Sequence, residues 1–283
     1  MARTGGERVK RIDRIIYITH ELLNNPGEMQ PLLKFVNFFG AAKSTISEDI
    51  DIVRKNLEEY GHGTVETVVG KSGGIKFIPF LSIDSIQEVL EKLKERIEER
   101  DRVLPGGYVY IADIVTNPKL INRLGKIMAG MFYKKSPDIV LCIETKGIPL
   151  AAFTAHYMGK PLVIAQRESK ITEGSVVTIN YISATTKKIQ TMSLSKRAIE
   201  PDSRVLVLDD FMKGGGTMKG MMDMVEEFNA EVVGKGVLMS TREPSNKLVE
   251  NYLTLAVFEE IDEATQDVKV NISPEHICSY DLS

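Results

Sequence analysis

A buried strand that leads directly into two acids and a glycine-rich turn constrains the fold of this chain more than any other stretch. Residues 205–208 are apolar throughout, as in a parallel strand that is covered on both faces. Asp209 and Asp210 follow, and three glycines and a threonine then precede a helical pattern. A strand, a tight loop and a helix start in this order are typical of an α/β domain that binds a ligand at the carboxyl edge of its sheet.

The acids and the loop suit different parts of one ligand. Glycines let the backbone approach an anion, successive N–H groups can cradle a phosphate, and the following helix directs the positive end of its dipole toward it. Carboxylates suit a sugar diol, or a metal ion that accompanies the phosphates. The stretch predicts a sugar-phosphate site, and an ordinary turn with surface acids is the alternative. The candidate ligand-binding residues are Asp209, Asp210, Phe211, Met212, Lys213, Gly214, Gly215, Gly216 and Thr217.

This stretch closely resembles the phosphoribosyl pyrophosphate (PRPP) signature of the type I phosphoribosyltransferases. The resemblance implies that the two acids hold the ribose hydroxyls and that the glycine loop takes the 5′-phosphate. One departure matters, because Lys213 and Gly214 stand where the enzymes usually carry a further acid and a threonine. That acid is thought to assist catalysis, whereas a lysine helps to bind a polyphosphate. We therefore expect a binding site without a catalytic residue or a catalytic cofactor.

From residue 108 onward, extended runs alternate with helical patterns, which predicts an α/β domain with a mostly parallel sheet. We expect strands at 108–114, 139–143, 162–165, 205–208, 231–239 and 253–258, and helices at 118–134, 149–158, 218–228 and 245–251. A second loop, Thr145, Lys146 and Gly147, resembles the pyrophosphate loop of the same family. The polar region 167–204 corresponds either to the family's flexible hairpin or to an idle surface hairpin. Tyr108 is a candidate for stacking on a nucleotide base, with core or interface packing as the alternative.

The first 80 residues have a different organisation. Helical patterns cover residues 12–23 and 31–39, and a third pattern in residues 42–57 places Ile46, Ile50, Val53 and Leu57 on one face. Thr45 and Glu48 have the spacing of a capping box at its start. The other face begins with Lys43, Ser44, Thr45 and Ser47, which are phosphate and base-edge hydrogen-bonders at a helix N-terminus.

Two extended runs, 64–69 and 75–78, follow the third helix and are joined by a glycine-rich basic tip, as in a β-hairpin. Three helices and a hairpin predict a winged helix-turn-helix that binds DNA. A small α+β dimerisation module is the alternative. The candidate DNA-binding residues are Arg3, Arg8, Lys43, Ser44, Thr45, Ser47, Lys71, Ser72, Gly73, Gly74 and Lys76.

Composition narrows the remaining choices. The net charge of −3 argues against a protein that is basic throughout, so DNA binding requires a local patch. The two cysteines and four histidines show no metal-ligand spacing, so we expect no metal site. The chain has no stretch typical of a membrane span or a signal peptide, which predicts a cytoplasmic protein without membrane contact. We expect a DNA-binding domain at 1–80 and an effector-binding domain at 81–283, with a linking helix in 81–107.

A winged helix followed by a phosphoribosyltransferase-like domain resembles the purine operon repressors of Gram-positive bacteria over nearly the whole chain. The resemblance implies a homodimer that binds double-stranded DNA upstream of purine genes. It also implies PRPP as an effector, with Mg²⁺ and guanosine tetraphosphate as further candidate ligands. The alternative is an active purine phosphoribosyltransferase with an accessory N-terminal dimerisation domain, because Asp209, Asp210 and the glycine loop are intact.

Overall fold

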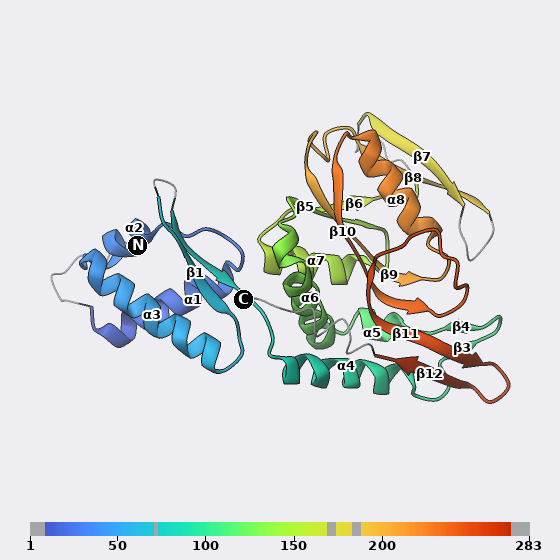
Figure 1. The fold of residues 1–283 in the computed structure, drawn as a ribbon, viewed down its shortest axis with the longest axis horizontal. Coiled ribbons are helices and arrows are strands. Elements are labelled where there is room, and N and C mark those ends of the chain that lie inside the picture. The colour runs from blue at the N-terminus through green and yellow to red at the C-terminus, as the bar shows by residue number, and fades with distance from the viewer. Residues whose placement is uncertain (1–8, 71–72, 169–173, 183–187, 273–283) are drawn as a thin grey trace. The chain divides into compact units, whose positions relative to one another are not determined.

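The computed structural model describes residues 9–70, 73–168, 174–182 and 188–272 (Figure 1). These residues form two compact units, and the main boundary between the units falls after Ser82. Each unit has a hydrophobic core of its own.

The first unit consists of three helices followed by a hairpin, as the sequence predicts. Its elements are α1 (Arg11–Asn24), α2 (Leu32–Phe39), α3 (Lys43–Glu59), β1 (Thr64–Val68) and β2 (Gly74–Ile78). The two strands are antiparallel, and Val65 lies opposite Phe77. The helices turn their apolar faces toward one core, which contains Ile18, Phe35 and Ile46.

The start of α3 differs from the sequence prediction. Thr45 and Glu48 predicted a capping box, but α3 begins at Lys43, and Ala42 occupies the N-cap position without a side-chain cap. Glu48 instead lies 3.7 Å from a guanidinium nitrogen of Arg11 on α1. The capping box is therefore wrong, because Glu48 has a partner on another helix and Thr45 lies inside the first turn.

A buried carboxylate joins α1 to α3. Asp49 on α3 is fully buried and lies 2.6 Å from Arg14 Nε and 3.1 Å from Arg11 Nε. Arg14 is itself buried and also donates to the backbone oxygen of Val9 at 2.8 Å. The carboxylate of Asp49 thus pairs with arginines inside the unit and does not face a ligand on the exposed side of α3.

The second unit is built on a six-stranded sheet with the order β12-β11-β10-β9-β5-β6 (Figure 1). Neighbouring strands are parallel except β11 and β12, which confirms the mostly parallel α/β sheet. The strands are β5 (Ile139–Ile143), β6 (Leu162–Ala165), β9 (Arg204–Met212), β10 (Glu231–Thr241), β11 (Leu253–Asp262) and β12 (Asp267–Asn271). The helices are α4 (Ile83–Ile97), α5 (Ala112–Val115), α6 (Pro118–Phe132), α7 (Ile148–Met158) and α8 (Gly216–Glu227), with a 3₁₀ turn at Tyr133–Lys135. Two small hairpins complete the unit, β3 (Val103–Leu104) with β4 (Tyr108–Val109), and β7 (Val176–Ile182) with β8 (Ile189–Ser195).

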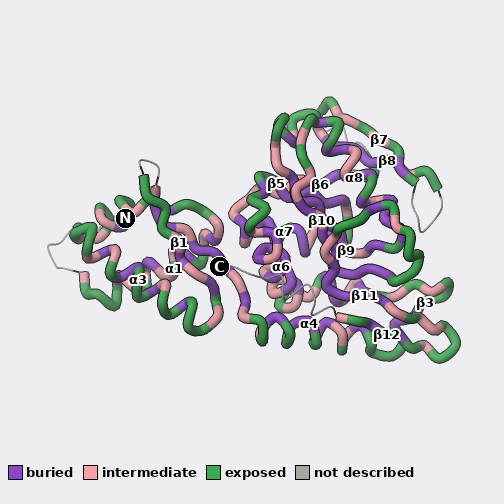
Figure 2. The backbone as a smooth tube through the Cα atoms, viewed as in Figure 1, coloured by how far each residue is buried: buried purple, intermediate pink, exposed green. Residues whose placement is uncertain are grey.

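Apolar side chains cover both faces of the central strands, which are buried along most of their length (Figure 2). On one face, Leu141 and Val207 share a core with Met221 of α8 and Met192 of β8. On the other face, the ring of Phe132 from α6 occupies the space where a side chain at position 234 would lie. Because both faces of the sheet are covered, the first part of β9 is a continuous apolar run in the sequence.

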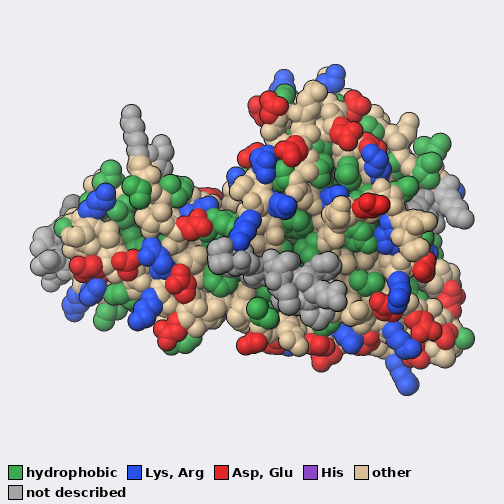
Figure 3. Space-filling model, viewed as in Figure 1, with side chains coloured by type: hydrophobic (Ala, Val, Ile, Leu, Met, Phe, Trp, Pro, Cys, Tyr) green, Lys and Arg blue, Asp and Glu red, His purple; other side chains and the backbone are tan. Residues whose placement is uncertain are grey.

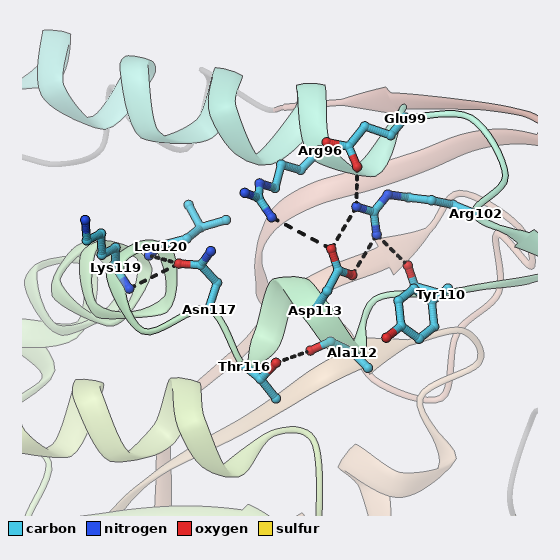
Figure 4. A network of polar contacts seen from close by, with 10 residues as sticks. All are labelled: Arg96, Glu99, Arg102, Tyr110, Ala112, Asp113, Thr116, Asn117, Lys119 and Leu120. Atoms are coloured by element: carbon cyan, nitrogen blue, oxygen red, sulfur yellow. Dashed lines mark hydrogen bonds and ion pairs between the residues drawn. The ribbon is translucent and has the colours of Figure 1, made fainter.

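An arginine cluster changes the chain direction where a longer strand was predicted. Residues 108–114 were expected to form one strand, but β4 ends at Val109 and α5 follows. Arg102 donates to both carboxylate oxygens of Asp113, at 2.8 and 2.9 Å, and to Tyr110 O at 3.0 Å (Figure 4). Hydrogen bonding to Asp113 raises the pKa of Arg102, and the same contact lowers the pKa of Asp113. The ion pair between buried Arg102 and half-buried Asp113 fixes the turn, so the strand prediction is wrong beyond Val109.

The helix predicted at 245–251 is also wrong, because these residues form an irregular connection between β10 and β11. Leu248 N donates at 3.0 Å to the backbone oxygen of Gly214, which is remote in sequence, and so does not take part in a local helical turn. Contact with a distant loop therefore overrides the local helical pattern.

Within the residues that the structure describes, no helix is both long and apolar enough to cross a membrane. The same residues contain no group of three or more His, Cys, Asp or Glu side chains that could hold a metal ion. Lys and Arg side chains alternate with Asp and Glu over the face of the second unit seen in Figure 3.

The Asp49 ion pairs predict a large loss of stability in the first unit. Asp49→Asn should lower the free energy of unfolding by about 3–5 kcal/mol, because Arg14 would remain buried without its partner charge. Asp51→Asn is the matched control on the same helix, since Asp51 is exposed and pairs with Arg54, and it should cost about 1 kcal/mol or less. Urea unfolding followed by hydrogen exchange in α1 and α3 measures both effects, and equal losses in the two variants would contradict the assignment.

Candidate ligand site at the carboxyl edge of the sheet

The central position of β9 brings the two acids to the middle of the sheet edge. β9 lies between β5 and β10, and Val205 to Leu208 are fully buried. Asp209 and Asp210 follow these residues at the carboxyl end of the strand, where α/β sheets bind ligands. The position of the acids is therefore fixed by strand pairing on both sides.

Asp209 is a desolvated carboxyl group. It is 6% exposed, and its Oδ1 accepts a hydrogen bond from Asp210 N at 2.9 Å. Burial and the neighbouring charge of Asp210 raise the pKa of Asp209 well above its usual value, while the more distant charge of Arg167 acts in the opposite direction. The site thus holds an acid that new hydrogen-bond donors, such as sugar hydroxyls, would stabilise.

The second predicted loop meets the first one directly. β5 pairs with β9 in parallel register, Cys142 opposite Leu208, so the loop after β5 emerges beside Asp209. A Cβ atom at Gly147 would lie 3.3 Å from Asp209 Oδ1 and 3.3 Å from Asp210 N. Glycine therefore permits this close approach. Thr145 and Lys146 are exposed, and the peptide bond between Glu144 and Thr145 is cis.

The glycine loop connects β9 to α8. Lys213 is exposed, the three glycines after it are buried, and Thr217 is half-buried in the first turn of the helix. Gly215 has φ +83°, a backbone conformation that favours glycine. The side chain of Met212 belongs to the hydrophobic core, and Phe211 packs its ring 5.7 Å from that of Phe258. Met212 can therefore reach a ligand only through its backbone.

Arg167 lies at the candidate site but was not predicted from the sequence. It follows β6, the neighbour of β5, and its backbone N–H donates to Glu144 Oε1 at 2.6 Å. Its guanidinium donates to Tyr181 Oη at 2.9 Å and to Gln190 Oε1 at 3.0 Å. Arg167 thus joins the loop after β5 to the β7–β8 hairpin. The local signal was a basic residue just beyond a predicted strand.

Tyr108 lies outside the strand–loop–helix segment. It belongs to the β3–β4 hairpin and is 52% exposed, and Gly106 N in the same hairpin donates to Glu263 Oε2 at 3.3 Å. Its exposure leaves the ring accessible, so stacking on a base stays a prediction.

The candidate DNA-binding residues of α3 are at the beginning of the helix. Lys43 and Ser44 are exposed, and Thr45 and Ser47 are half-buried. The nearby acids have partners, since Asp49 is buried against arginines and Glu48 lies beside Arg11. The first turn of α3 therefore offers donors and one exposed cation to a partner.

The hairpin residues have mixed surroundings. Lys76 on β2 faces Glu66 on β1, and its Nζ lies 3.8 Å from the carboxylate. A Cβ atom at Gly74 would lie 2.3 Å from Gln30 O, so close packing accounts for that glycine. Gly73 donates its N–H to Gly70 O at 3.1 Å. Four further candidates, Arg3, Arg8, Lys71 and Ser72, lie outside the described residues.

Two family models match the chain, one over each unit. Residues 10–79 match the model described as bacterial purine repressor, N-terminal, and residues 111–273 match the phosphoribosyl transferase domain. Both matched ranges agree with the folds described above.

Curated regulators match the chain over nearly its full length, and a curated enzyme matches about half of it. The purine biosynthesis transcriptional repressor PurR of Bacillus subtilis is 40% identical over 263 residues, which cover 93% of this chain and 92% of that protein. The purine biosynthesis transcriptional activator PurR of Lactococcus lactis subsp. lactis is 35% identical, over 93% of this chain and 97% of that protein. A xanthine phosphoribosyltransferase of Lachnoclostridium phytofermentans is 34% identical over 155 residues, which cover 53% of this chain and 79% of the enzyme.

The raised pKa of Asp209 predicts a pH-dependent cost to stability. Between about pH 4 and the raised pKa, the folded protein keeps a proton that the unfolded chain releases, so stability falls as pH rises through this window. Asp209→Asn removes the titration, and its stability relative to the unsubstituted protein should therefore increase with pH. Urea unfolding midpoints at about pH 5 and about pH 8 measure the difference. A difference that stays constant with pH would contradict the prediction.

Proposed function

Because the chain belongs to the PurR family of purine biosynthesis transcriptional regulators, we propose that it represses purine biosynthesis genes and senses PRPP through its second unit. The PRPP assignment rests on the groups that meet at one edge of the sheet. Asp209, Asp210, the glycine loop and the loop at 145–147 converge there, and Lys213 replaces the usual further acid. The edge has the groups for binding a sugar phosphate and lacks one group that assists transfer.

The first turn of α3 would meet DNA. Lys43 and Ser44 suit phosphate oxygens, and Thr45 and Ser47 suit phosphates or base edges in the major groove. The β1–β2 hairpin would act as the wing, with Lys76 near the phosphate backbone. A homodimer would place two such helices on paired half-sites, which is how helix-turn-helix proteins usually bind an operator.

Each part of the candidate site would bind a different group of PRPP. Asp209 and Asp210 would accept hydrogen bonds from the ribose hydroxyls, the glycine loop would take the 5′-phosphate, and residues 145–147 would take the pyrophosphate group. Two adjacent carboxylates form no complete cage for Mg²⁺, which prefers waters, one or two carboxylates and substrate phosphates. We therefore assign Mg²⁺ to the bound ligand and not to a resident site. Guanosine tetraphosphate carries the same kinds of phosphate groups and is a second candidate, with Tyr108 available to stack on its base.

Regulation requires that the ligand distinguishes two states of the protein. A ligand alters DNA affinity only by its differential affinity for the DNA-competent and DNA-incompetent states, and the coupling is reciprocal. We propose that PRPP favours the state that binds DNA weakly, so that abundant precursor relieves repression.

The alternative function is purine phosphoribosyl transfer. It is favoured by the intact acids and glycine loop, and by the 34% identity to a xanthine phosphoribosyltransferase over 155 residues. Lys213 argues against it, because a cation replaces an acid beside the reacting groups. Steady turnover of PRPP with any purine base would favour this alternative over a sensor without transferase activity.

Lys43 provides a test of the DNA interface. Lys43→Gln should weaken operator binding and reduce the slope of log affinity against log salt by about 1, because one phosphate contact is lost. Lys55→Gln is the matched control, an exposed lysine near the other end of α3, and it should leave the slope unchanged. Fluorescence anisotropy across a salt series measures both variants. Equal slopes for Lys43→Gln and the unsubstituted protein would place the interface elsewhere.

The paired acids provide a test of the effector site. The double variant Asp209→Asn with Asp210→Asn should bind the operator normally but lose its response to PRPP, because the ribose hydroxyls lose charged acceptors. Asp223→Asn on the exposed side of α8 is the control and should keep the response. Retention of full PRPP sensitivity in the double variant would show that the effector binds at another site.

A further inference from the structure

The connection between β10 and β11 (residues 242–252) lies against the back of the glycine loop. A Cβ atom at Gly215 would lie 3.3 Å from Val249 N and 3.4 Å from Leu248 N, so no side chain fits between the two segments without a shift. Val249 is 3% exposed and belongs to the core shared by the sheet and α8. The core thus anchors the connection where it meets the loop.

Two successive carbonyl groups of the loop accept hydrogen bonds from this connection. Lys247 Nζ donates to Lys213 O at 2.8 Å, and Leu248 N donates to Gly214 O at 3.0 Å. Lys247 Nζ also donates to Pro244 O at 3.0 Å within its own segment. Partial burial lowers the pKa of Lys247, and the charge of Glu243 opposes this effect. Hydrogen bonds from an ammonium group are stronger than those between neutral groups.

These bonds also determine where the loop N–H groups point. The peptide bonds after Lys213 and Gly214 are trans, and in a trans peptide the C=O and N–H groups point in opposite directions. Because both carbonyls face the connection, the N–H groups of Gly214 and Gly215 face away from it. Both glycines are buried, and in the described part of the chain neither N–H donates to an acceptor. Two adjacent backbone N–H groups without a partner favour an anionic ligand.

We propose that Lys247 is a positioning residue of the phosphate site, which holds the backbone of the glycine loop so that two N–H groups face the ligand. The inference rests on the proposed function, because it takes the 5′-phosphate of PRPP as the ligand of the loop. Lys247 acts through the loop backbone and does not itself contact the phosphate. Its role would be to preorganise the donors, which lowers the cost of ordering them on binding.

Calorimetric titration of the full-length protein with PRPP tests this role. Lys247→Met should raise the Kd for PRPP about tenfold, which is the effect expected from losing one charge-assisted hydrogen bond. Lys235→Met is the matched control, because Lys235 Nζ donates at 2.7 Å to Glu250 O on the same connection but not to the loop, and its Kd should stay within about twofold. Lys247→Arg keeps a donor and should restore the Kd to within about threefold.

Hydrogen exchange separates positioning from a general loss of stability. PRPP should protect the amides of Gly214 and Gly215 in the unsubstituted protein, and saturating PRPP should protect them much less in Lys247→Met. If Lys247→Met does not fold, Lys247→Ala takes its place. Unchanged affinity and unchanged protection in the Lys247 variant, with PRPP bound by the unsubstituted protein, would overturn the inference and leave the proposed function intact. Absence of PRPP binding by the unsubstituted protein would overturn both.

Discussion

The candidate ligand site depends on the placement of β9 between two parallel neighbours, in a sheet that side chains cover on both faces. This pairing carries Asp209 out of water and into contact with the loop that follows β5, where Gly147 leaves room for its carboxylate. The desolvation is unfavourable to the folded state on its own, as the raised pKa of Asp209 indicates. A ligand that supplies hydrogen-bond donors would offset this unfavourable free energy. Ionisable groups held in such unfavourable surroundings are typical of functional positions.

The same local structure serves a regulator as readily as an enzyme, because binding and chemistry use different groups. In the proposed sensor, the acids, the two loops and the start of α8 would bind the ligand, and all of them are present in this chain. Lys213 changes the charge at one position thought to assist catalysis, and the rest of the fold does not depend on it because its side chain is exposed. The separate first unit matches the N-terminal model of the bacterial purine repressor, and its DNA binding is what the ligand would regulate. Fold alone would not distinguish these uses.

Local patterns predicted the parts of this structure that depend on nearby residues. The apolar run of β9 and the glycine-rich turn predicted a strand, a loop and a helix, and the three helices and hairpin of the first unit were also correct. Long-range contacts account for the errors and omissions. The expected helix at 245–251 was displaced by hydrogen bonding to the distant glycine loop, and the expected strand at 108–114 was ended by the pairing of Arg102 with Asp113. Arg167 had only a weak local signal and Lys247 had none, because the partners that define their roles lie far away in the chain.

The proposed regulator binds purine-gene DNA, and PRPP changes that binding. The most direct measurement is fluorescence anisotropy of the unsubstituted protein with a duplex from its own purine promoter, with and without PRPP. We expect tight, salt-sensitive binding that PRPP weakens. Binding no stronger than to an unrelated duplex, in every condition, would contradict it and would favour an enzyme with an N-terminal dimerisation module.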